Sequence, residues 1–417
     1  MKKFIAIFFA SIIVSGCAGS VTRELNTVRS GFASNNFVAA ADTYADSKPI
    51  TDQDSLELLT TGLANFQAKN YKVSDDAFEE FNKRNYDTIG GSIVHEAKTL
   101  IGGGLADEYK PSMTDSLFVS YYQIWDAIGD GRKNDVRVII NQSYARQQDM
   151  SRAYANLIEK NQNRTDEGTQ ELMTTLQQQN ATWAAYTDIM NPALMYLSGI
   201  WFLNAGDFND ATTYLKRAVG MAQNNTYVAD DLKLAESKTR PQNTTWVFIE
   251  SGFAPGLVEK EMSLPFITTN GIIWISIAVA EPVFNKANVS IQGAKHLADV
   301  NAMFMTEFNE YRVNDALRSW ASATTRAVAQ TVAYNSNSKY AGWIGLASTI
   351  FSLATTNAEV RSWVTLPADI SVMRLKTADL IHDKFIATLG IELPKKGNHL
   401  IYVRLTDGVP NVHIFKI

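Results

Sequence analysis

Three stretches in the first 220 residues repeat one pattern of side chains, and this repeat constrains the fold more than any other feature of the sequence. Residues 36–44 (NFVAAADTY), 70–78 (NYKVSDDAF) and 207–215 (DFNDATTYL) each start with a polar residue and an aromatic one. A small residue follows three positions after the aromatic one, and a large apolar residue four positions after that. Residues four apart lie on the same face of an α-helix, so each stretch predicts the start of a packed helix.

The spacing of the stretches indicates repeated helical hairpins. The first two start 34 residues apart, which is the length of a tetratricopeptide repeat. Gly62 lies twelve residues before Ser74, and Gly199 lies twelve before Ala211, so small residues occur where the two helices of a hairpin would touch. We predict an irregular tetratricopeptide-like array, with a further hairpin at residues 120–147.

Stacked hairpins of this kind leave a concave face that binds an extended or helical peptide. Aromatic side chains are concentrated in the predicted helices at residues 121–125 and 196–202. We therefore take five of them as candidate anchors of an interaction groove: Tyr121, Tyr122, Trp125, Tyr196 and Trp201. The alternative is that these aromatic residues belong to the core and that the helices pack against a second domain.

The composition changes after Pro241, where β-branched and aromatic segments separated by Pro and Gly replace the helical periodicity. We place a domain boundary in residues 236–245, between a helical domain at 17–240 and an α+β domain at 244–417. The fold class is therefore α+β, an all-α array followed by a mostly antiparallel β domain that carries two helices. Candidate strands lie at residues 245–251, 257–266, 272–284, 287–295, 369–375, 384–390, 398–405 and 410–417.

Two helices are expected within the second domain. Residues 299–334 place apolar side chains, among them Phe304, Phe308 and Trp320, at helical spacing, so one face should lie on the sheet. Residues 341–354 (AGWIGLASTIFSLA) are apolar almost all round but too few to cross a bilayer unaided. This segment is predicted to be buried in the core; the alternative is insertion into lipid or into a partner's groove.

The amino terminus holds the single cysteine of the chain. Lys2 and Lys3 precede an apolar run over residues 4–14, which is typical of a secretory signal peptide. The run ends in Val-Ser-Gly-Cys and resembles the bacterial lipobox, which implies cleavage between Gly16 and Cys17 and attachment of diacylglycerol and palmitate to Cys17. Ala18 at the next position implies sorting to the outer membrane, facing the periplasm. The alternative is a buried or redox-active Cys17.

Cleavage of residues 1–16 removes two lysines and no acid, so the formal net charge changes from −5 to −7. This mildly acidic balance argues against a nucleic-acid partner, which calls for a basic patch. Without a second cysteine the domains need large hydrophobic cores, and 46% apolar residues allow them.

Patterns of catalytic and metal-binding residues are missing from the sequence. The five histidines are scattered, without the spacing of a zinc site, and no nucleophile elbow occurs. The adjacent acids Asp75-Asp76 and Asp230-Asp231 would point about 100° apart on a helix, so we interpret them as solvated helix faces. We predict no catalytic residue, no metal and no cofactor.

Several motifs together resemble an uncharacterised family of bacterial outer-membrane lipoproteins with a tetratricopeptide-like amino-terminal half and a β-rich carboxy-terminal domain. They occur in residues 196–218, 246–266 and 359–375. Relatives typically have an acid and Thr before Arg-Ser-Trp, whereas this chain has Glu359 and Val360. The resemblance implies an envelope protein as partner and no enzymatic activity. The motif residues that carry it are Glu250, Pro255, Glu261, Pro265, Arg361, Trp363 and Pro367.

We interpret these motif residues as structural. Proline favours extended backbone at the preceding residue and ends strands. Trp363 is expected to fill a gap between a helix end and the sheet. Arg361 is expected to pair with Glu250 or Glu261, and a buried pair of this kind is weak evidence for function.

Three functions remain open from the sequence. The first and favoured one is a lipid-anchored interaction scaffold that holds an envelope protein. The second is a subunit of an envelope export or surface-structure assembly. The third is an envelope enzyme that acts on glycan or lipid, for which paired carboxylates from distant parts of the chain would be needed.

Overall fold

Helical hairpins form the amino-terminal half of the protein. The computed structural model describes residues 26–45, 48–86, 109–163, 167–181, 185–186, 189–268, 271–284, 290–335, 358–406 and 409–417. Residues 26–33 form a helix that precedes α2, and the three repeated stretches begin at α2, α4 and α9. The hairpin helices are α2 (Phe37–Ala45), α3 (Ser55–Gln67), α4 (Tyr71–Tyr86), α5 (Met113–Gly129), α6 (Lys133–Gln162), α8 (Pro192–Ala205) and α9 (Phe208–Met221).

The two glycines singled out in the sequence lie where hairpin helices touch. A Cβ atom on Gly62 would lie 2.5 Å from the ring of Phe78, and one on Gly199 would lie 2.6 Å from Leu215. The predicted close contacts are therefore confirmed, and so is the hairpin at residues 120–147, which is formed by α5 and α6. The tetratricopeptide assignment itself stays a prediction.

Helix starts are fixed by local side chains. Asp54 at α3 and Ser112 at α5 each form a capping box with the acid three residues later, which satisfies backbone N–H groups that a helix start leaves free. Asn191 accepts a hydrogen bond from the backbone of Leu194 at the start of α8. α10 (Thr226–Glu236) follows α9, and the 3-10 turn η1 (Ile50–Asp52) precedes α3.

The carboxy-terminal half builds a five-stranded sheet in the order β4-β5-β1-β6-β7. Only β1 and β6 run parallel within it, and the other neighbours are antiparallel. The predicted α+β class is thus confirmed, with a mostly antiparallel sheet. The strands are β1 (Thr244–Ser251), β4 (Lys295–Asp299), β5 (Asp369–Lys376), β6 (His399–Leu405) and β7 (Asn411–Lys416).

The sheet packs directly on the first helices of the hairpins. Trp125 of α5 meets Phe248 of β1 at a ring-centroid distance of 5.3 Å and Tyr402 of β6 at 5.7 Å. Phe66 of α3 meets Tyr402 at 4.9 Å, and both belong to one large core of helix and sheet residues. The inner face of the helices is therefore filled by the chain's own sheet, and one core crosses the predicted domain boundary.

The other face of the sheet carries a smaller core. Val247, Ile401 and Val403 pack there against residues of η3 (Thr377–His382) and α12 (Lys384–Thr388), such as Leu380 and Ile386. Both faces of β1 and β6 are consequently buried, which explains their nearly continuous apolar sequences.

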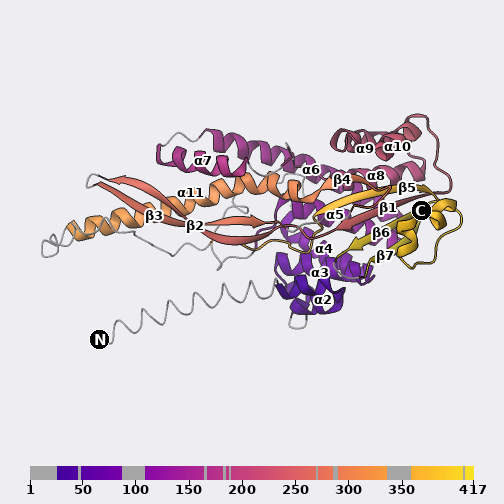
Figure 1. Cartoon of the computed structure of the whole chain (residues 1–417), viewed down its shortest axis with the longest axis horizontal. Helices are drawn as coiled ribbons and strands as arrows, with labels where there is room; N and C mark the ends of the chain where they lie inside the picture. The colour runs from indigo at the N-terminus through magenta and orange to yellow at the C-terminus, as the bar shows by residue number, and fades with distance from the viewer. Residues whose placement is uncertain are drawn as a thin grey trace.

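We call the hairpin helices and the five-stranded sheet, with their shared core, the body. An arm extends from it (Figure 1). It consists of the ribbon of β2 (Gly256–Thr268) and β3 (Gly271–Val283), the long helix α11 (Val300–Asn335), and α7 (Glu167–Asn180) beside α11. Leu176 of α7, Ile277 of β3 and Trp320 of α11 share a core of their own. α7 is therefore a packed helix of the arm.

Several sequence expectations need correction. Residues 290–294 are not a strand, and the strand starts at Lys295; residues 384–388 are helical because Asp383 caps them. Pro265 lies inside β2, opposite Trp274, rather than ending it. Both strands of a two-stranded ribbon are edges, where a missing N–H is tolerated. Segment 341–354 and Cys17 lie outside the described residues.

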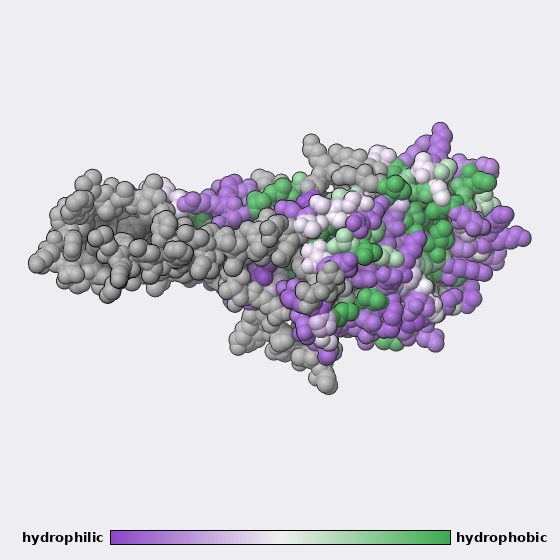
Figure 2. All heavy atoms as spheres, turned by 90° about the horizontal axis from the view of Figure 1, so that it is seen from below, coloured by the Kyte–Doolittle hydropathy of each residue, from purple (hydrophilic) through white to green (hydrophobic). Residues whose placement is uncertain are grey.

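The surface mixes polar and apolar residues. On the face drawn in Figure 2, hydrophilic residues cover most of the body, and hydrophobic ones gather near the end opposite the arm. Within the described ranges, none of the helices combines the length and the apolar character that a bilayer crossing needs.

Candidate binding site between the arm and the body

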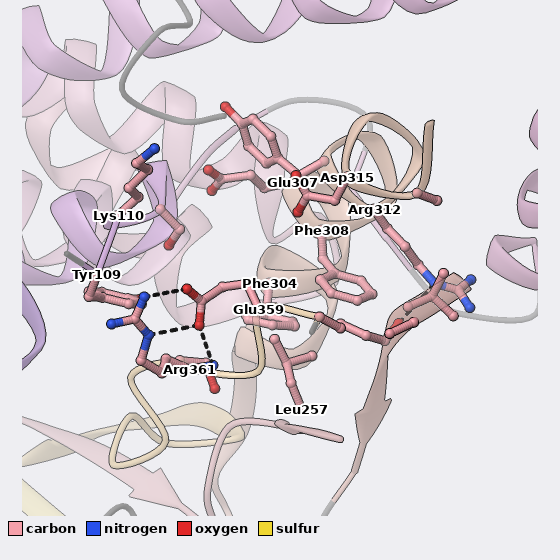
Figure 3. Close-up of a pocket in the computed structure, with 18 of the residues that line it drawn as sticks. Tyr109, Lys110, Leu257, Phe304, Glu307, Phe308, Arg312, Asp315, Glu359 and Arg361 are labelled. Atoms are coloured by element: carbon pink, nitrogen blue, oxygen red, sulfur yellow. Dashed lines mark hydrogen bonds and ion pairs between the residues drawn. The ribbon is translucent and has the colours of Figure 1, made fainter. Parts of the chain in front are cut away.

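A cavity of about 190 Å³ lies where the arm joins the body (Figure 3). Four parts of the chain line it: α11, the β2–β3 ribbon, residues 109–112 before α5, and residues 358–362 before β5. These parts are far apart in the sequence, so the cavity exists only in the folded chain.

Two aromatic rings form the apolar part of the cavity. Phe304 and Phe308 are one helical turn apart on α11, and their rings stack with centroids 5.5 Å apart and planes 18° apart. Both are only partly buried, and Leu257 and Ala280 of the ribbon lie in the same lining. The sequence predicted the α11 face that carries them to lie on the sheet, whereas these two rings face a cavity.

Charged side chains surround this apolar centre. Arg361 donates from Nε to Glu359 Oε1 at 2.8 Å, and its backbone N–H donates to the same oxygen at 2.9 Å (Figure 3). Lys110 and Asp315 also line the cavity. The rim therefore offers both signs of charge around a hydrophobic centre, which is the composition of a pocket for an apolar side chain of a polar partner.

Arg312 ties three elements together beside the cavity. Its Nε donates to Ala280 O of β3 at 3.0 Å, and its Nη1 and Nη2 donate to Asn180 Oδ1 and Gln179 Oε1 at the end of α7. Arg312 is 3% exposed, and burial lowers its pKa because the charged form is poorly solvated there.

Glu307 joins α11 to the start of α5. Its carboxylate oxygens accept from the backbone N–H groups of Met113 at 2.8 Å and Thr114 at 3.1 Å. Burial raises the pKa of Glu307 to about 8, and the nearby Asp115 adds to the effect, whereas the two N–H donors lower it. The carboxyl group thus titrates near neutral pH at the joint between arm and body.

Several polar side chains of the lining are held by hydrogen bonds within the fold. The Ser112 hydroxyl caps α5, and the Ser362 hydroxyl donates to Pro255 O at 3.5 Å, so both have structural roles. Glu307 is held by backbone N–H groups. Among the described residues, no three His, Cys, Asp or Glu side chains are placed to hold a metal ion.

The aromatic residues predicted to form a peptide groove do not form one. Tyr121, Tyr122, Trp125 and Tyr196 are fully buried, and Trp201 is partly buried against the same core. The prediction of a groove at these residues was wrong, because four of the rings are buried in the core that the helices share with the sheet, and Trp201 packs against that core. The alternative interpretation as core residues is confirmed for the four buried ones.

The motif acid Glu250 belongs to a buried network. Arg404 Nη1 donates to Glu250 Oε2 at 3.0 Å, and the hydroxyls of Tyr122 and Tyr402 donate to the same oxygen at 2.9 and 2.7 Å. Both charged side chains are 0% exposed. Arg361 pairs with Glu359 instead, so the expected pairing of Arg361 with Glu250 or Glu261 is wrong. Glu261 is exposed on the ribbon.

The other motif residues have structural positions. Trp363 is buried, with ring centroids 6.2 Å from those of Phe78 in α4 and of Tyr122 in α5. Pro255 comes directly before β2, and Pro367 lies two residues before β5. The Arg361 motif therefore borders the cavity on one side and is fixed in the core by Trp363 on the other.

One acid of each adjacent pair is buried, contrary to the expectation of solvated faces. Asp231 accepts from Tyr196 OH, Trp246 Nε1 and Arg374 Nε at 2.7 to 2.8 Å, and it links α8 and α10 to the sheet. Asp75 accepts from Gln123 and from Arg132. Asp76 and Asp230, the other members of the pairs, pair with nearby lysines on their own helices.

Glu307 and Arg312 were not among the residues predicted from the sequence. A signal was present, since the segment FMTEFNEYRV places each of these charges among apolar residues of one helix. Nothing in that segment, however, indicates that α5, α7 and β3 would supply the partners.

Comparison of the chain with protein-family models, with curated proteins and with solved structures finds no match in any of the three.

Proposed function

We propose that this protein is a lipid-anchored scaffold of the bacterial cell envelope that holds a partner protein in the cavity between arm and body. The lipobox-like start of the sequence supports anchoring through Cys17 at the outer membrane, facing the periplasm. We further propose that the protein binds its partner without acting on it as an enzyme.

The observation that carries this proposal is the stacked pair Phe304 and Phe308, which lies partly exposed inside a charged rim. Large apolar side chains in a well-packed pocket with a polar rim supply most of the binding energy of protein interfaces. A cavity of about 190 Å³ suits a single apolar or aromatic side chain of a partner rather than a whole peptide.

Site-specific photo-crosslinking in cells tests the proposal. A benzoylphenylalanine introduced in place of Phe308 should capture a discrete envelope protein, whereas the same group at Ile381, which is 68% exposed on η3, should not. Cys17→Ser should abolish the crosslink and the incorporation of labelled palmitate. Equal crosslinking from both positions, or from neither, would contradict the proposal.

The identity of the captured protein separates the alternatives. A crosslink between two copies of this chain would favour a subunit of an assembly over a scaffold for another protein. The crosslinking group can also be placed at Leu257, which lines the same cavity. Phe304→Ala and Phe308→Ala should each weaken capture of the partner by this group.

A further inference from the structure

A second, larger hollow lies on the outer side of the helical hairpins. α4 and α6 form its walls, residues 50–51 close one side, and Gln123 of α5 contributes to the floor; its volume is about 700 Å³. It shares no lining residue with the cavity between arm and body. We call it the α4–α6 groove.

Acids outnumber bases in the lining of this groove. Asp75, Asp76, Glu79 and Glu80 follow one another along α4 within two helical turns, and Asp135 faces them from α6. Like charges three or four residues apart destabilise a helix, so this row is not explained by the stability of α4. The basic residues of the lining are Lys83, Arg132 and Arg146.

All acids of the lining except Glu79 are already paired with the chain's own bases. Arg132 bonds to Asp75 and Asp135, Lys83 bonds to Glu80, and Lys72 bonds to Asp76. Glu79 forms no ion pair or hydrogen bond with the described residues. Partial burial raises the pKa of Glu79, and so does repulsion from Asp75 and Asp76, whereas the charges of Lys72 and Arg132 lower it. The raising effects prevail, so a further cation beside Glu79 would relieve the remaining repulsion.

The floor of the groove has an acceptor without a donor. Asn82 is 6% exposed, and its Nδ2 donates to Gln123 Oε1 at 2.9 Å. Its Oδ1 has no hydrogen-bond partner in the described structure. Buried polar atoms are nearly always hydrogen-bonded, and Asn82 lines the groove, so a cationic group that enters the groove can supply the missing donor.

The charge distribution indicates what kind of cation fits. The described residues contain no cluster of three His, Cys, Asp or Glu close enough to hold a metal ion, so the acids are spread along the groove. A ligand with several separated cationic groups matches this spread, and ammonium and guanidinium groups are also hydrogen-bond donors for the Asn82 oxygen.

We infer that the α4–α6 groove binds a lysine- or arginine-rich segment of a partner protein. Glu79 and the Oδ2 atom of Asp76, whose Oδ1 is held by Lys72, would receive its cationic groups along α4, while Asn82 accepts a hydrogen bond at the floor. This site is separate from the cavity of the proposed function and does not depend on it.

Fluorescence anisotropy with the full chain in detergent tests the inference. The probe is a labelled peptide of alternating lysine and alanine, and the same peptide with glutamate in place of lysine serves as a negative probe. We expect the lysine peptide to bind and the glutamate peptide not to bind. Because the acids are partly exposed, binding should weaken as the salt concentration rises from about 50 to about 500 mM.

Two double variants locate the site. Asp76→Asn with Glu79→Gln should weaken binding of the lysine peptide by roughly 3- to 10-fold, since each exposed charge pair contributes about 0.2–1 kcal/mol. Asp149→Asn with Glu159→Gln removes the same charge from α6 outside the groove lining and should leave the affinity unchanged. Circular dichroism should show that both variants stay folded.

Two results would overturn the inference. One is an equal loss of affinity in both double variants, which would mean that the peptide senses only the net charge. The other is the absence of binding by the unmodified chain at low salt.

Discussion

The body and the arm of this protein are held together in different ways. In the body, helices and sheet share one continuous core with a fully buried ion pair, Glu250–Arg404, inside it. In the arm, a two-stranded ribbon packs one face on α11 and α7, and Trp274 and Val258 remain about half exposed on the ribbon. The arm is joined to the body partly by polar contacts, notably those of Glu307 with α5. The body is therefore fixed by extensive packing, whereas the position of the arm depends on a few buried side chains.

The largest effect is expected in the body. Arg404→Met leaves Glu250 buried without its positive partner, which should cost about 3–5 kcal/mol of unfolding free energy. The measurement is urea denaturation followed by circular dichroism. Adding Glu250→Gln to Arg404→Met should recover part of the loss, because the uncompensated charge is then removed. If the double variant were less stable than Arg404→Met, the buried charge would not be the cause.

The arm should respond locally to the loss of its core. Trp320 is 7% exposed within the arm core, and Trp320→Ala should cost about 3–5 kcal/mol of packing there. Hydrogen exchange should speed up in β2, β3 and α7, while β1 and β6 of the body stay protected. Faster exchange in β1 as well would show that arm and body unfold as one unit, which would contradict the proposed difference between them.

The joint between the two parts should be sensitive to pH. The pKa of Glu307 is about 8 in the folded protein against an ordinary 4.5, so the folded state holds a proton that the unfolded state releases. The resulting stability is fully present below about pH 4.5 and is lost as the pH rises through 8, at about 1.4 kcal/mol per pKa unit.

The measurement compares wild type with Glu307→Gln, whose amide does not titrate. The stability of wild type relative to the variant should fall between pH 5 and pH 8.5, and amide exchange at the start of α5 should speed up over the same range. A constant difference across this range would mean that Glu307 keeps one protonation state.

The smallest effect distinguishes two glycines of the hairpins. Gly62→Ala should destabilise the body by about 1–3 kcal/mol, because the added Cβ would overlap the Phe78 ring. Gly220→Ala on α9 meets no atom within 4 Å and should stabilise by up to about 1 kcal/mol through helix propensity. Thermal unfolding of both variants measures the difference, and equal shifts would argue against the close contact of α3 with α4.

Local patterns predicted the elements of the fold well. The repeated stretches located the starts of α2, α4 and α9, and alternating or continuous apolar runs located β1, β2, β3, β5, β6 and β7. The segment at 384–390 was assigned to a strand because its composition is apolar and β-branched, whereas the Asp383 cap makes it helical. The candidate cavity was not predicted, since its residues come from four separate parts of the chain.

Side-chain periods and caps within a few residues were enough to predict the α+β class, the hairpins with their close glycine contacts, and most strands. The positions of the apolar faces, in contrast, depend on long-range packing. It placed the chain's own sheet against the inner face of the helices, which buries Tyr121 and Tyr196, and left Phe304 and Phe308 facing a cavity. An amphipathic pattern indicates that a face must be covered, whereas the covering element is selected by contacts between residues far apart in the sequence, such as Trp125 and Phe248.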